Sequence, residues 1–150
     1  MIIVYTPEGG PEERYDVRQL RTSEATRAAG AIGLRWAQVK ALLAEDDPDA
    51  MRACVWQFKA REQTGLRFGS FDPGVEDMVT RWDRREAEQL IAEGLKTPEE
   101  KPGERAEFFR VLVRNSADPA GTEALLAEMV DEDGGPKAAA DPSPTSPTSD

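Results

Sequence analysis

Histidine is absent from this chain of 150 residues, and cysteine occurs once, as Cys54. Without histidine there is no imidazole base, no Ser-His or Cys-His pair and no imidazole metal ligand. One cysteine permits neither an intramolecular disulfide nor a cysteine-based zinc site. No apolar run approaches the ~20 residues of a membrane-spanning helix, and the first residues do not have the form of a signal peptide. We therefore expect a cytoplasmic protein without metal or cofactor.

Positive charge is also scarce. Lysine and arginine number 19 against 29 aspartates and glutamates, so the formal net charge is −10. Nucleic acids and anionic lipids are polyanions, and this excess of negative charge argues against both as partners. Neither a phosphate-binding glycine loop nor a G-x-S-x-G motif occurs. The sequence thus nominates no catalytic residue, and we expect a protein that is not an enzyme.

A short strand pattern is present at residues 2–5, where β-branched and aromatic residues follow one another. Turn-forming residues fill 6–11, and apolar and polar residues alternate over 14–17. This order predicts a β-hairpin. Because two isolated strands are only marginally stable in water, the hairpin is expected to pack on other elements.

Helical spacing of apolar residues dominates the next part of the chain. It predicts helices over residues 22–32, 34–44, 48–64 and 74–94, the last with apolar positions at 75, 78, 79, 82, 90 and 91. Asp47-Pro48 and Asp72-Pro73 are start signals, because aspartate caps a helix and proline suits its first position. Glycines 33, 65 and 94 are predicted to end helices.

The sequence predicts a mainly α fold, a helical bundle with a small N-terminal β-hairpin and a disordered C-terminal tail. We expect a hairpin and bundle domain over 1–94, a linker over 95–104 rich in proline and charge, and a short helical region over 105–133. Residues 134–150 contain no aromatic or branched apolar residue and are predicted to be disordered.

Two polar features have plain structural interpretations. The acidic group of Asp46, Asp47 and Asp49 lacks the spacing of a calcium-binding loop, so helix capping is favoured over a metal site. Cys54 lies on the apolar face of its predicted helix, which favours a small buried hydrophobic residue over a nucleophile.

Four aromatic residues are the candidate partner-binding residues: Trp56, Phe68, Phe71 and Trp82. Trp56 falls off the main apolar face of its helix, so either that helix is sandwiched or Trp56 faces a partner. Phe68 and Phe71 stand three apart in a Gly/Ser connector, where they either contact a partner or hold the connector on the bundle. Trp82 ends an apolar stripe and suits either the rim of an interface or the edge of the core.

Three short motifs carry a resemblance to a known family. They are Gly33-Leu-Arg-Trp36, the helical segment MRACVWQFKA at 51–60 and the connector LRFGSFD at 66–72. Together they resemble the tail assembly chaperones of long-tailed bacteriophages, especially those of actinobacterial phages. That family combines a small helix ending in glycine, a nearby tryptophan, a V-W or L-W pair and an L-x-F-x-x-F-D connector. The match covers roughly residues 20–73.

The resemblance implies a chaperone that coats the long, apolar tape measure protein and keeps it soluble until tail tube subunits polymerise around it. The tail tube protein and a second copy of the chain are further candidate partners. The family also implies action in the host cytoplasm, absence from the mature virion, and a longer form made by ribosomal frameshifting. Gly135-Pro136-Lys137 is compatible with a slip-prone codon sequence.

Two other classes of protein remain open from the residues alone. One is an acidic adaptor or inhibitor that binds a host protein, which requires carboxylates concentrated on one face, whereas arginines are interspersed here. The other is an enzyme that uses carboxylates alone, which requires paired acids in a concave apolar pocket.

Overall fold

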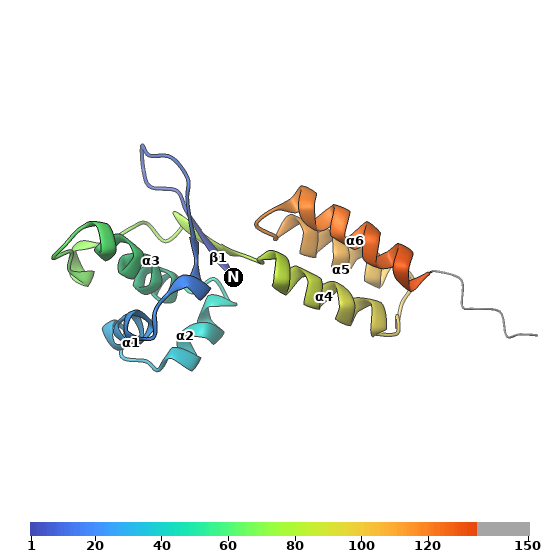
Figure 1. The fold of residues 1–150 in the computed structure, drawn as a ribbon, viewed down its shortest axis with the longest axis horizontal. Coiled ribbons are helices and arrows are strands. Elements are labelled where there is room, and N and C mark those ends of the chain that lie inside the picture. The colour runs from blue at the N-terminus through green and yellow to red at the C-terminus, as the bar shows by residue number, and fades with distance from the viewer. Residues whose placement is uncertain (135–150) are drawn as a thin grey trace, which may run out of the picture.

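Six α-helices and one three-stranded sheet are formed by residues 1–134, the part of the chain that this computed structural model describes (Figure 1). The strands are β1 (Ile2–Tyr5), β2 (Glu13–Asp16) and β3 (Met78–Arg81). The helices are α1 (Thr22–Ala31), α2 (Trp36–Leu43), α3 (Pro48–Glu62), α4 (Arg84–Lys96), α5 (Glu104–Arg114) and α6 (Pro119–Asp133). The predicted mainly α fold with a small N-terminal β element is confirmed.

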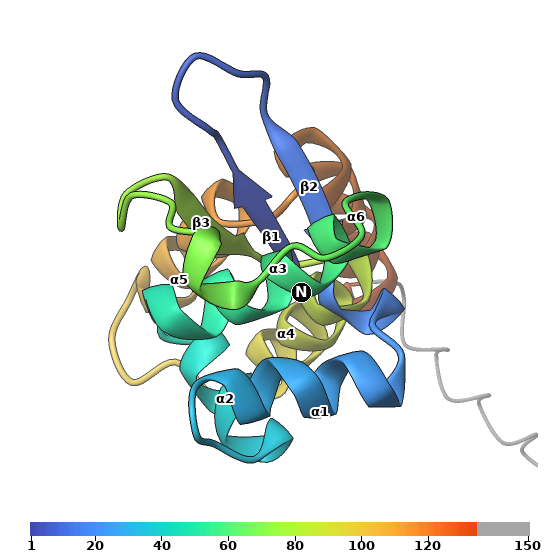
Figure 2. The same cartoon turned by 90° about the vertical axis from the view of Figure 1, so that its left-hand side faces the viewer.

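β1 lies at the centre of the sheet, between β2 and β3, and pairs antiparallel with both (Figure 2). Ile3 stands opposite Tyr15 on one side and Thr80 on the other. Ile3 and Tyr5 belong to the main core, while Val4 between them is buried on the opposite face. The predicted hairpin is confirmed, and a third strand that the sequence analysis does not anticipate joins it.

Residues 78–81 form β3, so the helix predicted over 74–94 is wrong in its first part. The apolar residues of that part follow helical spacing, which is the source of the error. The second edge of β1 needs partners for its backbone N–H and C=O groups, however, and Val79 and Thr80 are β-branched residues that suit a strand. Pairing with a distant strand therefore overrides the local pattern.

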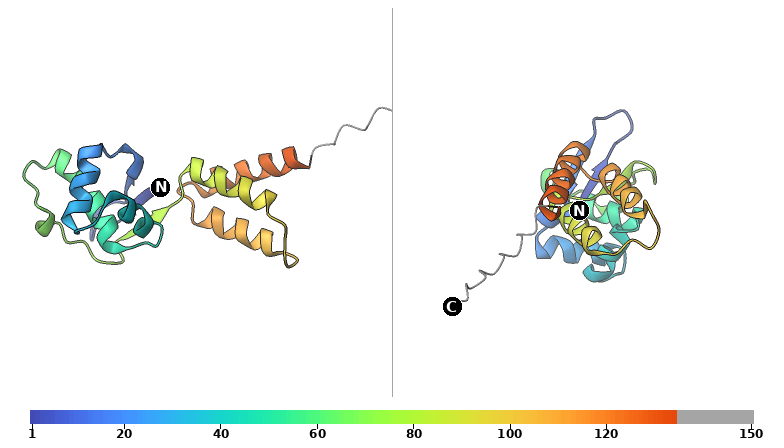
Figure 3. Two further views of the ribbon diagram at one scale, coloured as in Figure 1. Left: turned by 90° about the horizontal axis from the view of Figure 1, so that it is seen from below. Right: turned by 90° about the vertical axis from the view of Figure 1, so that its right-hand side faces the viewer.

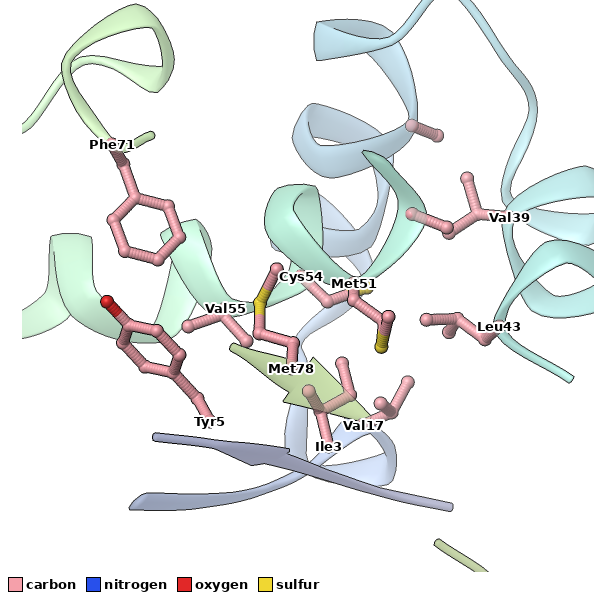
Figure 4. Close-up of a cluster of buried hydrophobic side chains, with 12 residues drawn as sticks. Ile3, Tyr5, Val17, Val39, Leu43, Met51, Cys54, Val55, Phe71 and Met78 are labelled. Atoms are coloured by element: carbon pink, nitrogen blue, oxygen red, sulfur yellow. The ribbon is translucent and has the colours of Figure 1, made fainter. Parts of the chain in front are cut away.

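The first of two lobes, the N-terminal lobe, comprises the sheet and α1–α3. Its core is crossed by α3, from which Met51, Cys54 and Val55 reach the sheet and α2 (Figure 4). Cys54 is completely buried, and burial raises the pKa of its thiol to about 12. The interpretation of Cys54 as a small buried hydrophobic residue is confirmed.

The acidic turn before α3 caps a helix and supports the sheet. Asp47 accepts the backbone N–H of Ala50 at 2.9 Å, as the cap-plus-proline signal predicts. Asp46 has φ of 55°, in the left-handed region, and its Oδ1 accepts both the N–H and the hydroxyl of Thr80 at 2.6 Å. The turn thereby holds the outer side of β3.

The second lobe, the C-terminal lobe, comprises α4, α5 and α6. These helices pack around a separate apolar cluster of Ile91, Phe109, Leu112 and Leu125. The sequence analysis groups residues 84–94 with the N-terminal bundle, whereas the packing groups them with α5 and α6. The predicted disordered tail, 134–150, lies outside the described residues except for Gly134. Residues 135–137, where the sequence is compatible with a ribosomal frameshift, lie outside them as well.

Gly94 does not end α4, which continues to Lys96, so the predicted end of this helix is wrong. A Cβ atom at Gly94 would lie 2.7 Å from Cε1 of Phe109 and 3.0 Å from Cε1 of Phe108. Glycine is therefore present because α5 approaches α4 closely at this point. The chain turns between the two helices over residues 97–103, within the predicted linker.

The two lobes are joined where the chain passes from β3 to α4 (Figure 3). Trp82 lies in this junction. Its backbone N–H donates to the carbonyl of Asn115 at 3.0 Å, and its carbonyl accepts the N–H of Ala117 at 2.8 Å. Arg14, just inside β2, donates to the carbonyl of Ala117 at 2.6 Å. Main-chain hydrogen bonds thus tie the end of β3 to the turn between α5 and α6.

A buried carboxylate in the N-terminal lobe makes stability depend on pH. Glu24 is 6% exposed and accepts Nε and Nη2 of Arg61 at 2.7 and 2.6 Å. The hydrogen bond from Arg61 is the main cause that lowers the pKa of Glu24 to about 2, in spite of desolvation. Glu24 also accepts the N–H of Arg21, the residue before the first turn of α1, at 2.7 Å.

We predict that Glu24→Gln, which retains the capping acceptor, lowers the free energy of unfolding at pH 7 by about 1 kcal/mol, a modest value because Arg61 is partly exposed. The folded pKa lies below the ordinary value of 4.5, so this stabilisation is present above pH 4.5 and is lost as pH falls toward 2. Urea unfolding measures the free energy of unfolding of wild type and of Glu24→Gln at pH 7 and at pH 3. We expect the difference between the two proteins to be smaller at pH 3, and an equal difference at both pH values contradicts the prediction.

Candidate functional site

Residues 1–134 contain neither a cluster of metal-binding side chains nor a membrane-spanning helix. Within residues 1–134 no group of three or more histidine, cysteine, aspartate or glutamate side chains is arranged to hold a metal ion. No helix in the same range is long and apolar enough to cross a membrane. The depressions on the surface of the described residues have apolar and charged linings.

Trp56 and Phe68 form a half-buried aromatic pair beside α3. Their ring centroids lie 5.3 Å apart, and Nε1 of Trp56 donates to the carbonyl of Leu66 at 2.9 Å. Trp56 is thus covered on one side by the connector, which follows α3. This contact is compatible with a sandwiched helix and leaves part of the indole accessible.

Arg52 holds the same connector on α3. Its guanidinium lies 4.1 Å from the ring centroid of Phe68 and donates to the carbonyls of Phe68 and Phe71 at 3.1 and 2.6 Å. An arginine that stacks on an aromatic ring and bonds two carbonyls at once fixes the backbone as well as the ring. The connector is therefore an anchored segment.

Phe71 is 8% exposed and packs edge-on against Tyr5, with ring centroids 5.8 Å apart (Figure 4). Its side chain has almost no surface left for a partner in this conformation. Of the four aromatic residues predicted to bind a partner, Trp56, Phe68 and Phe71 are brought together at the connector. Trp82 lies apart from them, at the junction.

Trp82 lines an open groove of about 350 Å³ between the lobes, which we call the junction groove. Its apolar lining comes from the end of α2, from Trp82 and from the facing sides of α4 and α5. These residues are Ala44, Trp82, Leu90, Phe108, Val111 and Leu112. Asp46, Thr80, Arg81 and Asn115 supply its polar lining.

Two residues of this groove are missed by the sequence analysis. Phe108 is 41% exposed and Val111 39% exposed, and both line the junction groove, which the exposed Val75 and Val130 do not. Both lie on α5 beside the buried Phe109 and Leu112. The available signal is the run FFRVLV at 108–113, which has more apolar residues than one helix face holds.

A second depression of about 450 Å³, which we call the acidic cleft, adjoins the junction groove. Leu90 and Phe108 line both. Gly94, Thr97 and Pro98 also line the cleft, together with four glutamates and one arginine: Glu93, Glu99, Glu100, Glu104 and Arg105. The groove and cleft together form one continuous surface along α4 and α5, apolar toward Trp82 and negative toward the 97–103 turn.

Comparison of the chain with family models, with curated proteins and with solved structures gives no match in any of the three.

Phe71 and Phe68 provide a test of the anchored connector. We predict that Phe71→Ala lowers the free energy of unfolding by about 3 kcal/mol, because it empties a buried site against Tyr5. Phe68→Ala is expected to lower the free energy of unfolding by about 1 kcal/mol. The ring that this substitution removes is only half-buried, and its main contacts are with Arg52 and Trp56. Urea unfolding followed by tryptophan fluorescence measures both. A larger effect for Phe68→Ala than for Phe71→Ala contradicts the assignment of Phe71 to the core.

Proposed function

We propose that this chain is a non-enzymatic assembly chaperone of a long-tailed bacteriophage, which binds the tape measure protein. In this role it keeps that protein soluble in the host cytoplasm, helps tail tube subunits polymerise around it, and does not remain in the mature virion. The observation that carries the proposal is the exposed apolar surface of Phe108 and Val111 beside Trp82 in the junction groove.

An apolar groove suits a chaperone because burial of apolar surface is non-directional. A client with many similar apolar helical segments does not require one fixed set of hydrogen bonds to be bound. Large exposed apolar side chains that border a groove are typical of protein-binding surfaces. The groove is shaped by residues of both lobes, so that it exists only in the folded chain.

The charge of the chain supports the same function. A formal net charge of −10 gives complexes of this protein with an apolar client a common negative surface. Like charges keep such complexes apart and oppose aggregation. A chaperone of this kind requires neither a catalytic residue nor a cofactor.

The resemblance to tail assembly chaperones is a separate support. It covers roughly residues 20–73, in the N-terminal lobe, whereas most of the junction groove is formed by residues 80–115. The motifs and the groove are therefore independent observations. The half-buried pair of Trp56 and Phe68 remains a predicted second contact for the client.

Coexpression tests this function. The full chain is produced together with an apolar, helical fragment of a tape measure protein, and the soluble share of the fragment is measured. We predict that wild type keeps the fragment soluble and that Phe108→Ser with Val111→Ser does not. Removal of the two apolar contacts is expected to cost about 1.5 kcal/mol of binding, which is roughly tenfold in Kd.

Val130→Ser is the matched control. Val130 is 43% exposed on α6, close to the exposure of Val111, but it lies outside the junction groove. This variant should keep the fragment soluble, and all variants should retain the wild-type circular dichroism spectrum. Failure of wild type to keep the fragment soluble overturns the proposal and favours the acidic adaptor or inhibitor.

A further inference from the structure

The junction groove and the acidic cleft share two lining residues, so one ligand of sufficient length can cover both. Leu90 on α4 and Phe108 on α5 line both depressions. From Glu104 at the cleft to Asn115 at the groove, the surface follows α5 over 11 residues, roughly 16 Å at the rise of an α-helix. A ligand that covers both therefore has an apolar part and a part that meets negative charge.

The charge of the cleft is available to a ligand. Its four glutamates and one arginine give a formal charge of −3. Within the described residues none of the four glutamates takes part in an ion pair. Arg105 instead donates Nη2 to the carbonyl of Thr97 at 2.7 Å, and its backbone N–H bonds Glu99 at 3.0 Å. Its guanidinium is thus bonded to the backbone of the turn between α4 and α5.

From this juxtaposition we infer that the occupant of the groove is an amphipathic α-helix of a partner protein, with lysine or arginine at the end that reaches the acidic cleft. A helix fits because Phe108 and Val111 are one turn apart on α5 and present a ridge against which a second helix packs. The inference rests on the proposed function and adds to it the chemistry of the client segment.

Two other occupants fit less well. A second copy of this chain carries the same acidic cleft and the same net charge of −10, so charge opposes it. Residues 135–150 of the chain itself contain no aromatic or branched apolar side chain, so they do not match the apolar groove. They contain only one lysine, so they do not match the acidic cleft either. Charge complementarity therefore selects a basic partner.

The test uses three labelled helical peptides of about 18 residues that share one apolar face. They differ only at one end, which carries two lysines, two glutamines or two glutamates. Fluorescence anisotropy with the full wild-type chain measures Kd in low salt and at physiological salt. The lysine peptide is expected to bind about fivefold more tightly than the glutamine peptide, and salt is expected to reduce this preference. The glutamate peptide is expected to bind most weakly.

Variants with reversed charge in the cleft test the role of its glutamates directly. Glu93→Lys with Glu100→Lys should reverse the preference, so that the glutamate peptide binds best. Glu88→Lys with Glu128→Lys changes the net charge by the same amount at exposed positions outside both depressions, and should leave the preference as in wild type. Val111→Ser should weaken the binding of all three peptides, whereas Val130→Ser should leave the Kd of each unchanged.

Equal binding of the lysine and glutamine peptides overturns the inference, as does an equal response to the two charge-reversal pairs. Either result leaves the coexpression outcome, and with it the proposed function, unaffected. Conversely, a wild-type chain that prefers the lysine peptide but does not keep the tape measure fragment soluble supports the inference and refutes the chaperone function. The two failures are thus distinguished.

Discussion

The hydrogen-bonding requirement of β1 is the constraint on which the rest of this structure depends. β1 is the central strand and is buried, so the backbone groups on both of its edges need partners. β2 supplies one set from the adjacent hairpin, while β3 supplies the other from more than 70 residues further along. Placing β3 there puts Trp82 at the edge of the sheet and makes Asp83 the cap of α4, whose capping box with Glu86 starts the C-terminal lobe.

The candidate site is a consequence of this arrangement. The two lobes have separate apolar cores. They meet through the backbone of Trp82 and the turn after α5, and through ion pairs of the Met1 amino group with Asp83 and Glu86 at 2.5 and 2.7 Å. A groove lies between the lobes, and α5 lines it with Phe108 and Val111, two apolar side chains that stay exposed. The acidic turn between these helices extends the same surface with negative charge. The proposed binding of an amphipathic helix rests on this combination of an apolar groove and negative charge.

Much of the fold could be predicted from local signals. Asp47-Pro48 marks the first turn of α3, since capping depends on neighbouring residues. The same signal at Asp72-Pro73 is wrong, because no helix begins there and the chain goes on to form β3. The prediction failed at β3 and Gly94, because the pairing of one and the close helix contact of the other involve residues distant in sequence. Of the aromatic residues predicted to bind a partner, Trp82 lines the junction groove, whereas Phe71 is buried. The sequence analysis did not predict the exposed groove residues Phe108 and Val111. Exposure depends on which helix face a neighbour covers, and local spacing does not contain that information.

The sequence by itself determined the mainly α class, the N-terminal hairpin, most helix starts and the negative charge, because these follow from composition and from contacts within a few residues. It also excluded histidine-based chemistry. Only the tertiary structure decided that residues 78–81 form a strand, that α4 packs with α5 and α6, and that Leu90 and Phe108 join an apolar groove to an acidic cleft. The physical reason is that hydrogen bonding across a sheet and the burial of apolar faces are satisfied over the whole chain at once, and they override a local preference where the two conflict.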